Sequence, residues 1–195
     1  TVPSASSKLV SGPVTLTGTT TVTARCFRNG KPVSGPGSAT FTKVMPTPSA
    51  NVEGVGSGIQ YAYFEGDWNV LPDFTKQKAT KIGALANFDL SPRAVPEYFG
   101  LEYTCFVRIP EGGVYSFYIA SDDGSRLFLD NKILIDNDGL HGMVEKKGVA
   151  ALSAGLHPLT VQYFQKGGGR DINVSLEGPK SGKQTLPVSM LYMKK

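Results

Sequence analysis

Residues 121–139 read SDDGSRLFLDNKILIDNDG and predict a β-hairpin that begins at a pair of adjacent carboxylates. Apolar and polar side chains alternate in SRLFL and again in KILID, as they do in strands with one buried face. Asp130-Asn131 lies between the two runs and is typical of a tight turn between antiparallel strands. The hairpin returns the chain beside its origin, so we expect residues 136–141 near Asp122-Asp123.

The composition of the whole chain favours an all-β protein. Its 195 residues include 23 Gly and 13 Pro but only short runs of helix-favouring residues, which indicates many turns and short strands. A hydrophobic content of 40% is sufficient for packed cores. This length fits one large domain or two small ones.

Alternating runs continue on the N-terminal side of the hairpin. Residues 100–120, GLEYTCFVRIPEGGVYSFYIA, predict two strands about a Pro-Glu-Gly-Gly turn. One face of the first strand carries Tyr103, Cys105, Val107 and Ile109. The second strand buries either Tyr115, Phe117 and Ile119 or the opposite set Val114, Tyr118 and Ala120. The other predicted core residues are Leu127, Leu129, Ile133, Ile135, Val161 and Tyr163.

The segment before these strands combines a strand with an irregular stretch. Its aromatic residues could stack on sugar rings, but alternation favours a place in the core. These residues are Tyr61, Tyr63, Phe64 and Trp68. Residues 70–98 contain prolines and few periodic positions, so we expect a long excursion with one helical turn near Asp73 to Lys78.

Charge and cysteine content do not indicate a nucleic-acid or membrane protein. The formal charge is +4, and close basic clusters occur only at Lys146-Lys147 and Lys194-Lys195, whereas nucleic acid favours a basic stripe with exposed aromatics. Cys26 and Cys105 fall in different predicted domains, so no disulfide is expected between them. No apolar run has the length of a membrane span, so we expect no membrane insertion.

The first quarter of the chain predicts a separate β module. Val22, Ala24 and Cys26 alternate with polar residues, an Asn29-Gly30 turn follows, and residues 39–44 alternate again. About three strands are too few to enclose a core. We therefore expect a partial immunoglobulin-like β-sandwich module.

The predicted domain boundaries follow the composition. Residues 1–46 form the partial module, and residues 47–57, rich in Pro, Gly, Ser and Asn, form a linker. Residues 58–195 form the second, strand-rich domain.

The residues of the first module resemble a known family. PVTLTGTTTVTARCFRNGKPVSGPGSATFTKV, residues 13–44, is similar to the end of the sandwich module at the C-terminus of chitobiases and β-hexosaminidases. This resemblance implies the C-terminal part of a secreted bacterial glycoside hydrolase, with its catalytic domain and signal peptide upstream.

The second domain resembles the protective-antigen-type (PA14) domain. The stretches that carry the resemblance are YAYFEGDWNVLPDF, NFDLSPR, VRIPEGGVYSFYIASDDGSRLFLDNKILIDNDGLHG, GLHPLTVQYFQKGGG and SLEGP. The resemblance covers residues 58–195 and implies an antiparallel β-barrel or sandwich. Such domains accompany glycosidases, adhesins and toxins, and they bind carbohydrate or pack beside a domain that does.

The adjacent aspartates have two interpretations. In an extended trans chain Asp122 and Asp123 point to opposite faces, whereas a cis peptide turns both toward one side. In the adhesin branch of the resembled family such a pair binds calcium through a cis bond, so the resemblance implies calcium as a cofactor here. The alternative is a structural turn, in which Asp122 caps backbone amides, Gly124 has a positive φ and Asp123 pairs with Arg126 or another basic group.

A calcium site needs more oxygens than two carboxylates supply. The loop 166–171, KGGGRD, can offer backbone carbonyls and a further carboxylate, and a second polar cluster follows the hairpin. The predicted ligand-binding residues are Asp122, Asp123, Asp138, His141, Gly168 and Asp171, of which the first two are the predicted metal ligands.

These residues favour binding over catalysis. Glycoside hydrolysis needs two carboxylates about 5–9.5 Å apart, which adjacent aspartates on a turn do not provide, and no Gly-x-Ser-x-Gly nucleophile motif is present. We therefore expect no catalytic residue. The favoured function is a carbohydrate-binding accessory module of a larger, β-hexosaminidase-like glycoside hydrolase, with glycans and the upstream catalytic domain as partners. The alternative is a structural module that supports the catalytic domain without a ligand. The resemblance implies a secreted, periplasmic or cell-surface location.

Overall fold

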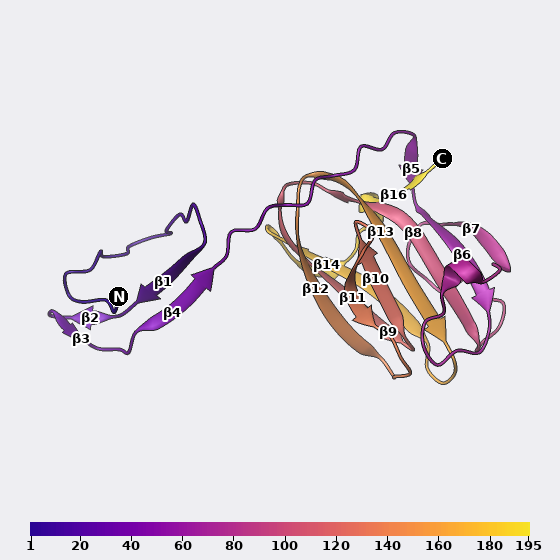
Figure 1. Ribbon diagram of the computed structural model, residues 1–195, viewed down its shortest axis with the longest axis horizontal. Helices are drawn as coiled ribbons and strands as arrows, with labels where there is room; N and C mark the ends of the chain where they lie inside the picture. Colours follow the sequence, from indigo (N-terminus) through magenta and orange to yellow (C-terminus); the bar gives the residue numbers. More distant parts are fainter. The chain divides into compact units, whose positions relative to one another are not determined.

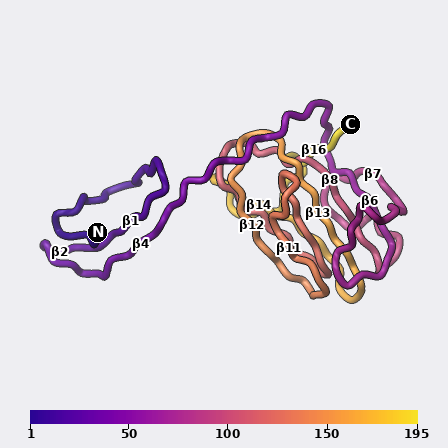
Figure 2. The backbone as a smooth tube through the Cα atoms, in the orientation of Figure 1, coloured from indigo at the N-terminus to yellow at the C-terminus, as the bar shows by residue number.

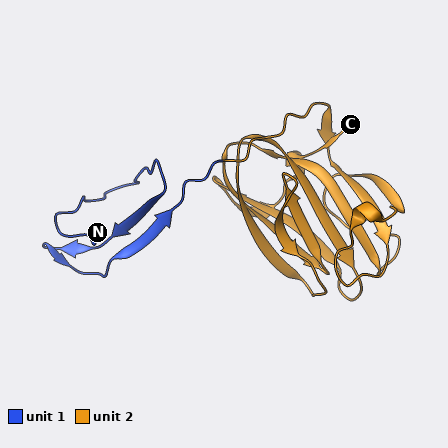
Figure 3. Cartoon of the chain, in the orientation of Figure 1, with its two compact units in different colours: residues 1–45 blue, residues 46–195 orange.

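The computed structural model describes residues 1–195 and divides the chain into two units, Thr1–Met45 and Pro46–Lys195 (Figure 3). Every regular element is a strand apart from two single 3₁₀ turns, so the all-β prediction is confirmed. No helix is long and apolar enough to cross a lipid bilayer.

The first unit consists of two short antiparallel ribbons. Its strands are β1 (Thr20–Ala24) paired with β4 (Gly37–Phe41), and β2 (Phe27–Arg28) paired with β3 (Lys31–Pro32). The predicted Asn-Gly turn joins β2 to β3, with φ of 50° at Asn29 and 72° at Gly30, as a type I′ turn requires. No side chain of this unit is buried, so the ribbons enclose no core. Cys26 here and Cys105 in the second unit are free thiols.

The second unit contains two antiparallel sheets (Figures 1 and 2). The strands of the larger sheet are β5 (Val55–Ser57), β6 (Ile59–Glu65), β7 (Lys81–Leu85), β8 (Phe99–Ile109), β10 (Ser125–Leu129), β11 (Lys132–Asn137), β13 (Gly155–Gln165) and β16 (Leu191–Lys194). The strands of the smaller sheet are β9 (Gly113–Asp122), β12 (Val144–Leu152), β14 (Asp171–Gly178) and β15 (Ser181–Thr185).

Each sheet has a continuous strand order. The larger sheet runs β11-β10-β13-β8-β16-β5, and β6 pairs with both β8 and β7. The smaller sheet runs β12-β9-β14-β15. β9 ends in the smaller sheet and β10 begins in the larger one, so the chain crosses between sheets at residues 122–125.

Alternation along the strands places one apolar face of each sheet in a shared core. β8 buries Tyr103, Cys105, Val107 and Ile109, as predicted. On β9 the first of the two predicted sets is the correct one, because Tyr115, Phe117 and Ile119 are buried and Val114 is exposed. The remaining predictions that are confirmed are Leu127, Leu129, Ile135, Val161 and Tyr163.

The prediction for Ile133 is wrong. Its side chain is 55% exposed, because the register of β10 with β11 shifts between Leu127 and Phe128. Leu127 lies opposite Ile135 and Phe128 lies opposite Ile133, so Leu134 is the extra residue of a bulge. The prediction assumed unbroken alternation along β11 and therefore placed Ile133 on the inner face.

The segment predicted as a linker is bound to the second unit. The N–H of Thr47 donates to the carbonyl of Ala151 at 2.8 Å, and Ala50 bridges Leu156. β5 then pairs with β16. The structural boundary therefore lies at Pro46 rather than at residue 58, because bridges through backbone atoms need no apolar period in the sequence.

The excursion between β6 and β8 contains the expected helical turn and an additional strand. A 3₁₀ turn, η1 (Phe74–Lys76), begins after Asp73, whose carboxylate accepts from the N–H of Thr75. β7 was not predicted. A small apolar cluster lies beneath the turn and contains Phe64, Leu71, Phe74 and Phe164, with Trp68 packed against it. The core placement of Tyr61, Tyr63 and Phe64 is confirmed.

Candidate functional site

The aspartate pair lies where the chain leaves the smaller sheet. Asp122 is the last residue of β9, and Asp123 begins the crossing to β10. The peptide bond between them is cis. The two carboxylates have different surroundings, and these differences separate their roles.

Asp123 is buried and its carboxylate is used by the protein itself. Its Oδ2 accepts from the backbone N–H of Lys166 at 2.9 Å and of Gly167 at 3.4 Å. Its Oδ1 accepts from the N–H of His141 at 3.2 Å. The carboxylate thus holds two loops, the one after β13 and the one after β11, at the end of β9. Each of these hydrogen bonds is assisted by charge.

The predicted alternative pairing of Asp123 with Arg126 is wrong. The guanidinium of Arg126 instead lies 3.0 Å from Asp136 and 3.3 Å from Asp138. Asp138 also accepts from the N–H of Leu71 at 2.7 Å, so it ties the excursion after β6 to the loop after β11. This predicted site residue therefore has a structural role, because its carboxylate is occupied by donors of the chain.

Gly124 is required for a reason other than the predicted one. It is not among the residues with positive φ. A Cβ at this position would instead collide with the ring of Phe164 and lie 2.8 Å from the carbonyl oxygen of Gly139. The glycine permits close approach of two backbones beneath the aspartate pair.

Asp122 differs from Asp123 because no donor of the chain reaches its half-buried carboxylate. Burial and then the charge of Asp123 raise the pKa of Asp122, and the proximity of His141 lowers it in part. The Asp122 carboxylate lies against Gly169, where any side chain would collide with Oδ2. The carboxylate of Asp122 is therefore partly exposed, accepts no hydrogen bond from the chain and faces a space that a glycine keeps open.

Asp171 and Gly168 lie beside Asp122. Asp171 is directly opposite Asp122 in the pairing of β9 with β14, so the two side chains share a face of the smaller sheet. Gly168 has φ of 86° and belongs to the same exposed loop as Gly169. The structure thus brings together Asp122, Asp123, Gly168 and Asp171 from sequence positions almost 50 residues apart.

His141 is brought to the pair through its backbone. Its ring contacts two carbonyl oxygens, with Nδ1 at 2.8 Å from Gly142 and Nε2 at 2.9 Å from Asn137. A neutral imidazole donates only one hydrogen bond, whereas a protonated ring can donate both. Both ring nitrogens therefore face carbonyl oxygens of the loop. The backbone N–H of His141, and not its ring, donates to Asp123.

Gln165 and Tyr163 are site residues that sequence reasoning did not assign. Gln165 is fully buried, accepts from the N–H of Asp123 at 3.2 Å and donates to the carbonyl of Gly169 at 2.7 Å. The phenol of Tyr163 lies 2.5 Å from the carbonyl oxygen of Asp122 and 2.6 Å from Gln165 Oε1. Burial, followed by the charges of Asp123, Asp122 and Asp171, raises the pKa of Tyr163, so the phenol remains a donor. The sequence feature that could have identified Gln165 is a polar residue at a position of the strand that faces the core.

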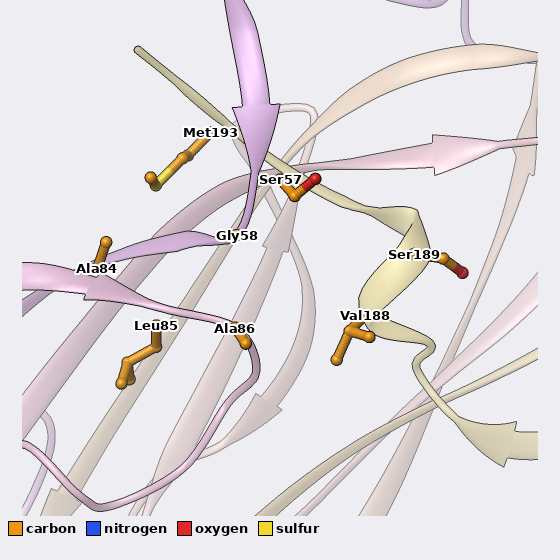
Figure 4. A pocket seen from close by; sticks show the side chains of 8 residues that line it. All are labelled: Ser57, Gly58, Ala84, Leu85, Ala86, Val188, Ser189 and Met193. Carbon is orange, nitrogen blue, oxygen red and sulfur yellow. The ribbon is translucent and has the colours of Figure 1, made fainter.

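The hollow in Figure 4 does not belong to this site. It measures about 480 Å³ and is lined by parts of β5, β7, β16 and the 3₁₀ turn η2 (Val188–Met190), including Leu85, Val188 and Met193 (Figure 4). None of the six predicted site residues lines it. It is a shallow, largely apolar depression without a charged group.

Comparisons with known proteins identify the second unit. The family model described as the PA14 domain matches residues 54–189. Among curated proteins, the anti-sigma-I factor RsgI3 of Acetivibrio thermocellus is 25% identical over 145 residues, which is 71% of this chain. The present chain spans only 22% of the length of that relative.

Solved structures show the same fold. A structure titled anti-sigma factor domain-containing protein matches with a TM-score of 0.63 and 21% identity, covering 72% of this chain and 49% of that one. The PA14 sugar-binding domain from an RTX adhesin matches with a TM-score of 0.59 and 13% identity, covering 71% and 99% of the two chains. At such identities the likeness concerns the fold alone.

Proposed function

The chain belongs to the PA14 domain family, and from this membership together with the geometry at Asp122 we propose that its second unit is a non-catalytic carbohydrate-binding module. The observation that carries the proposal is the carboxylate of Asp122, which lies beside open glycine backbone and receives no hydrogen bond from the chain. Sugar hydroxyls are donors, and they would satisfy this acceptor.

The backbone beneath Asp122 is held by hydrogen bonds that need no ligand. Asp123, Gln165 and Tyr163 form a closed network that fixes the end of β9 and the 166–169 loop. A site with its supporting hydrogen bonds in place loses little conformational entropy when it binds. This arrangement favours a glycan-binding role for Asp122, whereas Asp123 holds the loop through hydrogen bonds.

We propose calcium as a cofactor of this site. Asp122 would supply both carboxylate oxygens, and Asp123 would supply a remaining lone pair of Oδ1. Calcium takes six to eight oxygens, and no group of three or more acidic, His or Cys side chains that could hold a metal is present. Backbone carbonyls of the 166–171 loop and the hydroxyls of the sugar would complete the shell. When bound, the ion would supply the positive charge that orients those hydroxyls.

A module without a ligand is the second candidate. It is favoured by Asp123 and Asp138, whose carboxylates are occupied by donors of the chain. Under this alternative Asp122 would contact only water or another domain. The two functions differ at Asp122, because only glycan binding makes its charge necessary.

The protein that contains this module is proposed to act outside the cytoplasm, in a secreted, periplasmic or cell-surface location. The resemblance of residues 13–44 to the chitobiase and β-hexosaminidase module supports a parent glycoside hydrolase with an upstream catalytic domain. The names of the relatives support a different parent, an anti-sigma factor. The binding role of the second unit is the same for both parents.

A glycan array tests the proposal. The full chain would be applied with calcium and again with a chelator, and compared with Asp122→Asn and with Glu53→Gln, an exposed carboxylate without an ion pair, as the control. We expect binding by the native chain and the control, and its loss in Asp122→Asn. Failure of the native chain to bind any glycan under either condition would contradict the proposal.

Calorimetry separates the cofactor from the glycan. A calcium concentration one hundred times Kd should stabilise the native chain by about 2.7 kcal/mol, because only the folded site binds the ion. Asp122→Asn should remove most of this gain. If glycans bind equally well in the chelator, the calcium proposal is wrong while the carbohydrate proposal stands.

A further inference from the structure

A second hollow borders the aspartate site and is lined by two arginines. It measures about 390 Å³, and its lining residues are Ser91, Arg93, Ala94, Val95, Pro96 and Arg170. Arg170 directly follows Gly169, against which the carboxylate of Asp122 lies. The hollow and the candidate sugar site are therefore neighbouring parts of one surface.

Neither arginine is neutralised by the protein. Every ion pair of an arginine in the chain involves Arg126, and no acidic oxygen lies within ion-pairing distance of Arg93 or Arg170. Each guanidinium is positioned by one backbone carbonyl, Arg93 by Leu90 at 3.1 Å and Arg170 by Pro96 at 3.4 Å. Most of the N–H donors of both side chains remain available.

The nearby acidic groups do not neutralise Arg93 or Arg170. The carboxylate of Asp89 accepts from the N–H of Ser91 at 2.8 Å, which directs it to the backbone. Glu97 belongs to an adjoining hollow and lies 3.6 Å from the position of a Cβ on Gly167. Asp122 lies beyond Gly169. Two positive charges thus face one shallow hollow, whose other lining residues are Ser91, Ala94, Val95 and Pro96.

The chemistry of the lining selects an anionic group of a sugar. Two guanidinium forks match the planar oxygens of a carboxylate, and such contacts are stronger than neutral hydrogen bonds. No aromatic ring lines the hollow, which disfavours a nucleobase because bases bind by stacking. A uronic acid carries its carboxylate on the same ring as its hydroxyls, so one residue can reach both the arginines and the neighbouring site.

We propose that the Arg93–Arg170 hollow is a subsite for the carboxylate of a uronic acid residue, so that the glycan recognised by this module is an acidic polysaccharide. This inference rests on the proposed function, because the uronic acid is held as part of a glycan that also contacts Asp122. Arg93 and Arg170 bind the carboxylate, and Asp122 receives the hydroxyls of the same or the next sugar.

Matched pairs of oligosaccharides test the subsite. The probes are oligogalacturonates, oligoglucuronates and alginate oligomers, each beside its carboxyl-reduced form, which keeps the linkage and loses the charge. Sulfated neutral oligosaccharides form a further arm. We expect at least one acid form to bind about tenfold to hundredfold more tightly than its reduced partner. High salt should narrow this difference, because the arginines are exposed.

Substitutions assign the difference to the two arginines. Arg93→Gln and Arg170→Gln should each remove most of the preference for the acid form. Arg93→Gln, which lies outside the 166–171 loop, should in addition leave the affinity for the reduced form unchanged. Arg93→Lys and Arg170→Lys keep the charge without the fork and should give intermediate values. Arg28→Gln, an exposed arginine of the first unit, is the control and should change nothing. Thermal unfolding of each variant excludes loss of structure as the cause.

Four results would overturn the inference. Equal binding of acid and reduced forms, or an acid preference that both glutamine variants retain, removes the carboxylate subsite while leaving the carbohydrate proposal intact. Binding of the sulfated probes in place of the uronates assigns the hollow to sulfate esters and rejects the uronate. If no form of any glycan binds, both the subsite and the proposed function fail.

Discussion

The backbone N–H of Lys166 lies 2.9 Å from Oδ2 of Asp123, and this bond joins two loops 43 residues apart in sequence. Together with the bonds from Gly167 and His141, it makes Asp123 the common acceptor of the site. Asp122, its neighbour, accepts none of these donors. The two aspartates therefore differ in what their removal should do.

Asp123→Asn should destabilise the fold by about 1–3 kcal/mol, because an amide replaces one acceptor oxygen with donors that face backbone N–H groups. The matched comparison is Asp122→Asn, which makes the same chemical change, loses no hydrogen bond and should not lower the stability. Denaturant unfolding of both variants measures the difference. Equal stabilities would mean that the Asp123 bonds contribute nothing net.

Asp122→Asn should raise the stability of the metal-free protein at neutral pH. Burial and the charge of Asp123 raise the pKa of Asp122 in the folded state, so the folded chain takes up this proton more readily than the unfolded chain does. The ionised carboxylate thus opposes folding at neutral pH, and this cost disappears as the pH falls through the raised pKa. Unfolding midpoints of variant and native protein should differ at neutral pH and converge near pH ~3. A constant difference across this range would exclude the charge as its origin.

Gly169→Ala should impair ligand binding with little effect on stability. The added methyl group meets only the end of the Asp122 side chain, which can turn aside, so the expected cost is below about 1 kcal/mol. Gly142→Ala is the control, because nothing lies within 4 Å of its Cβ position. Calcium and glycan titrations measure binding, and thermal unfolding measures stability. Undiminished binding would show that the Asp122 carboxylate need not keep its position.

Gly124→Ala, unlike Gly169→Ala, should lower the stability of the fold. Its methyl group would meet the ring of Phe164 and the backbone of Gly139, neither of which can move freely. Such overpacking costs about 1–3 kcal/mol. A chemical unfolding curve like that of the native chain would show that the two loops beneath the pair are more pliable than their contacts suggest.

Leu129→Ala and Ile133→Ala test the register of the hairpin. Leu129 is 5% exposed, so its truncation should lower the free energy of unfolding by about 2–5 kcal/mol. Ile133 is 55% exposed, so its truncation should lower the free energy of unfolding by less than about 1 kcal/mol. Urea unfolding of the two variants measures both values. The reverse order would place the bulge of β11 elsewhere.

Period-2 alternation was sufficient to predict the buried face of β8, and it reduced β9 to two alternative faces without choosing between them, because neither strand contains a bulge. It failed at Ile133, where the extra residue Leu134 shifts the pairing by one. Alternation counts positions along one strand, whereas a bulge is a property of two paired strands. The linker prediction failed for a related reason, since Thr47 and Ala50 are held through backbone atoms.

The aspartate pair was visible in the sequence, but the different roles of Asp122 and Asp123 were not. Which donors reach Asp123 depends on the loop after β13, which lies close in space and far along the chain. The local sequence also left open whether His157 lies at the surface or packs inside, and the structure buries it with Nδ1 at 3.1 Å from the carboxylate of Asp130. Long-range polar contacts of this kind have no local sequence pattern.

The pairing of β5 with β16 places Val55 opposite Lys194. The start of β5 and the end of β16 thus run side by side, separated by the ordinary distance between strands of about 4.8 Å. A fold with this property can be spliced into a surface loop of an unrelated host, because the host chain is interrupted and resumed at almost the same point. For the same reason the segment from β5 to β16 could be circularly permuted, with a short connection joining residue 195 to residue 54 and new ends opened at a distant turn.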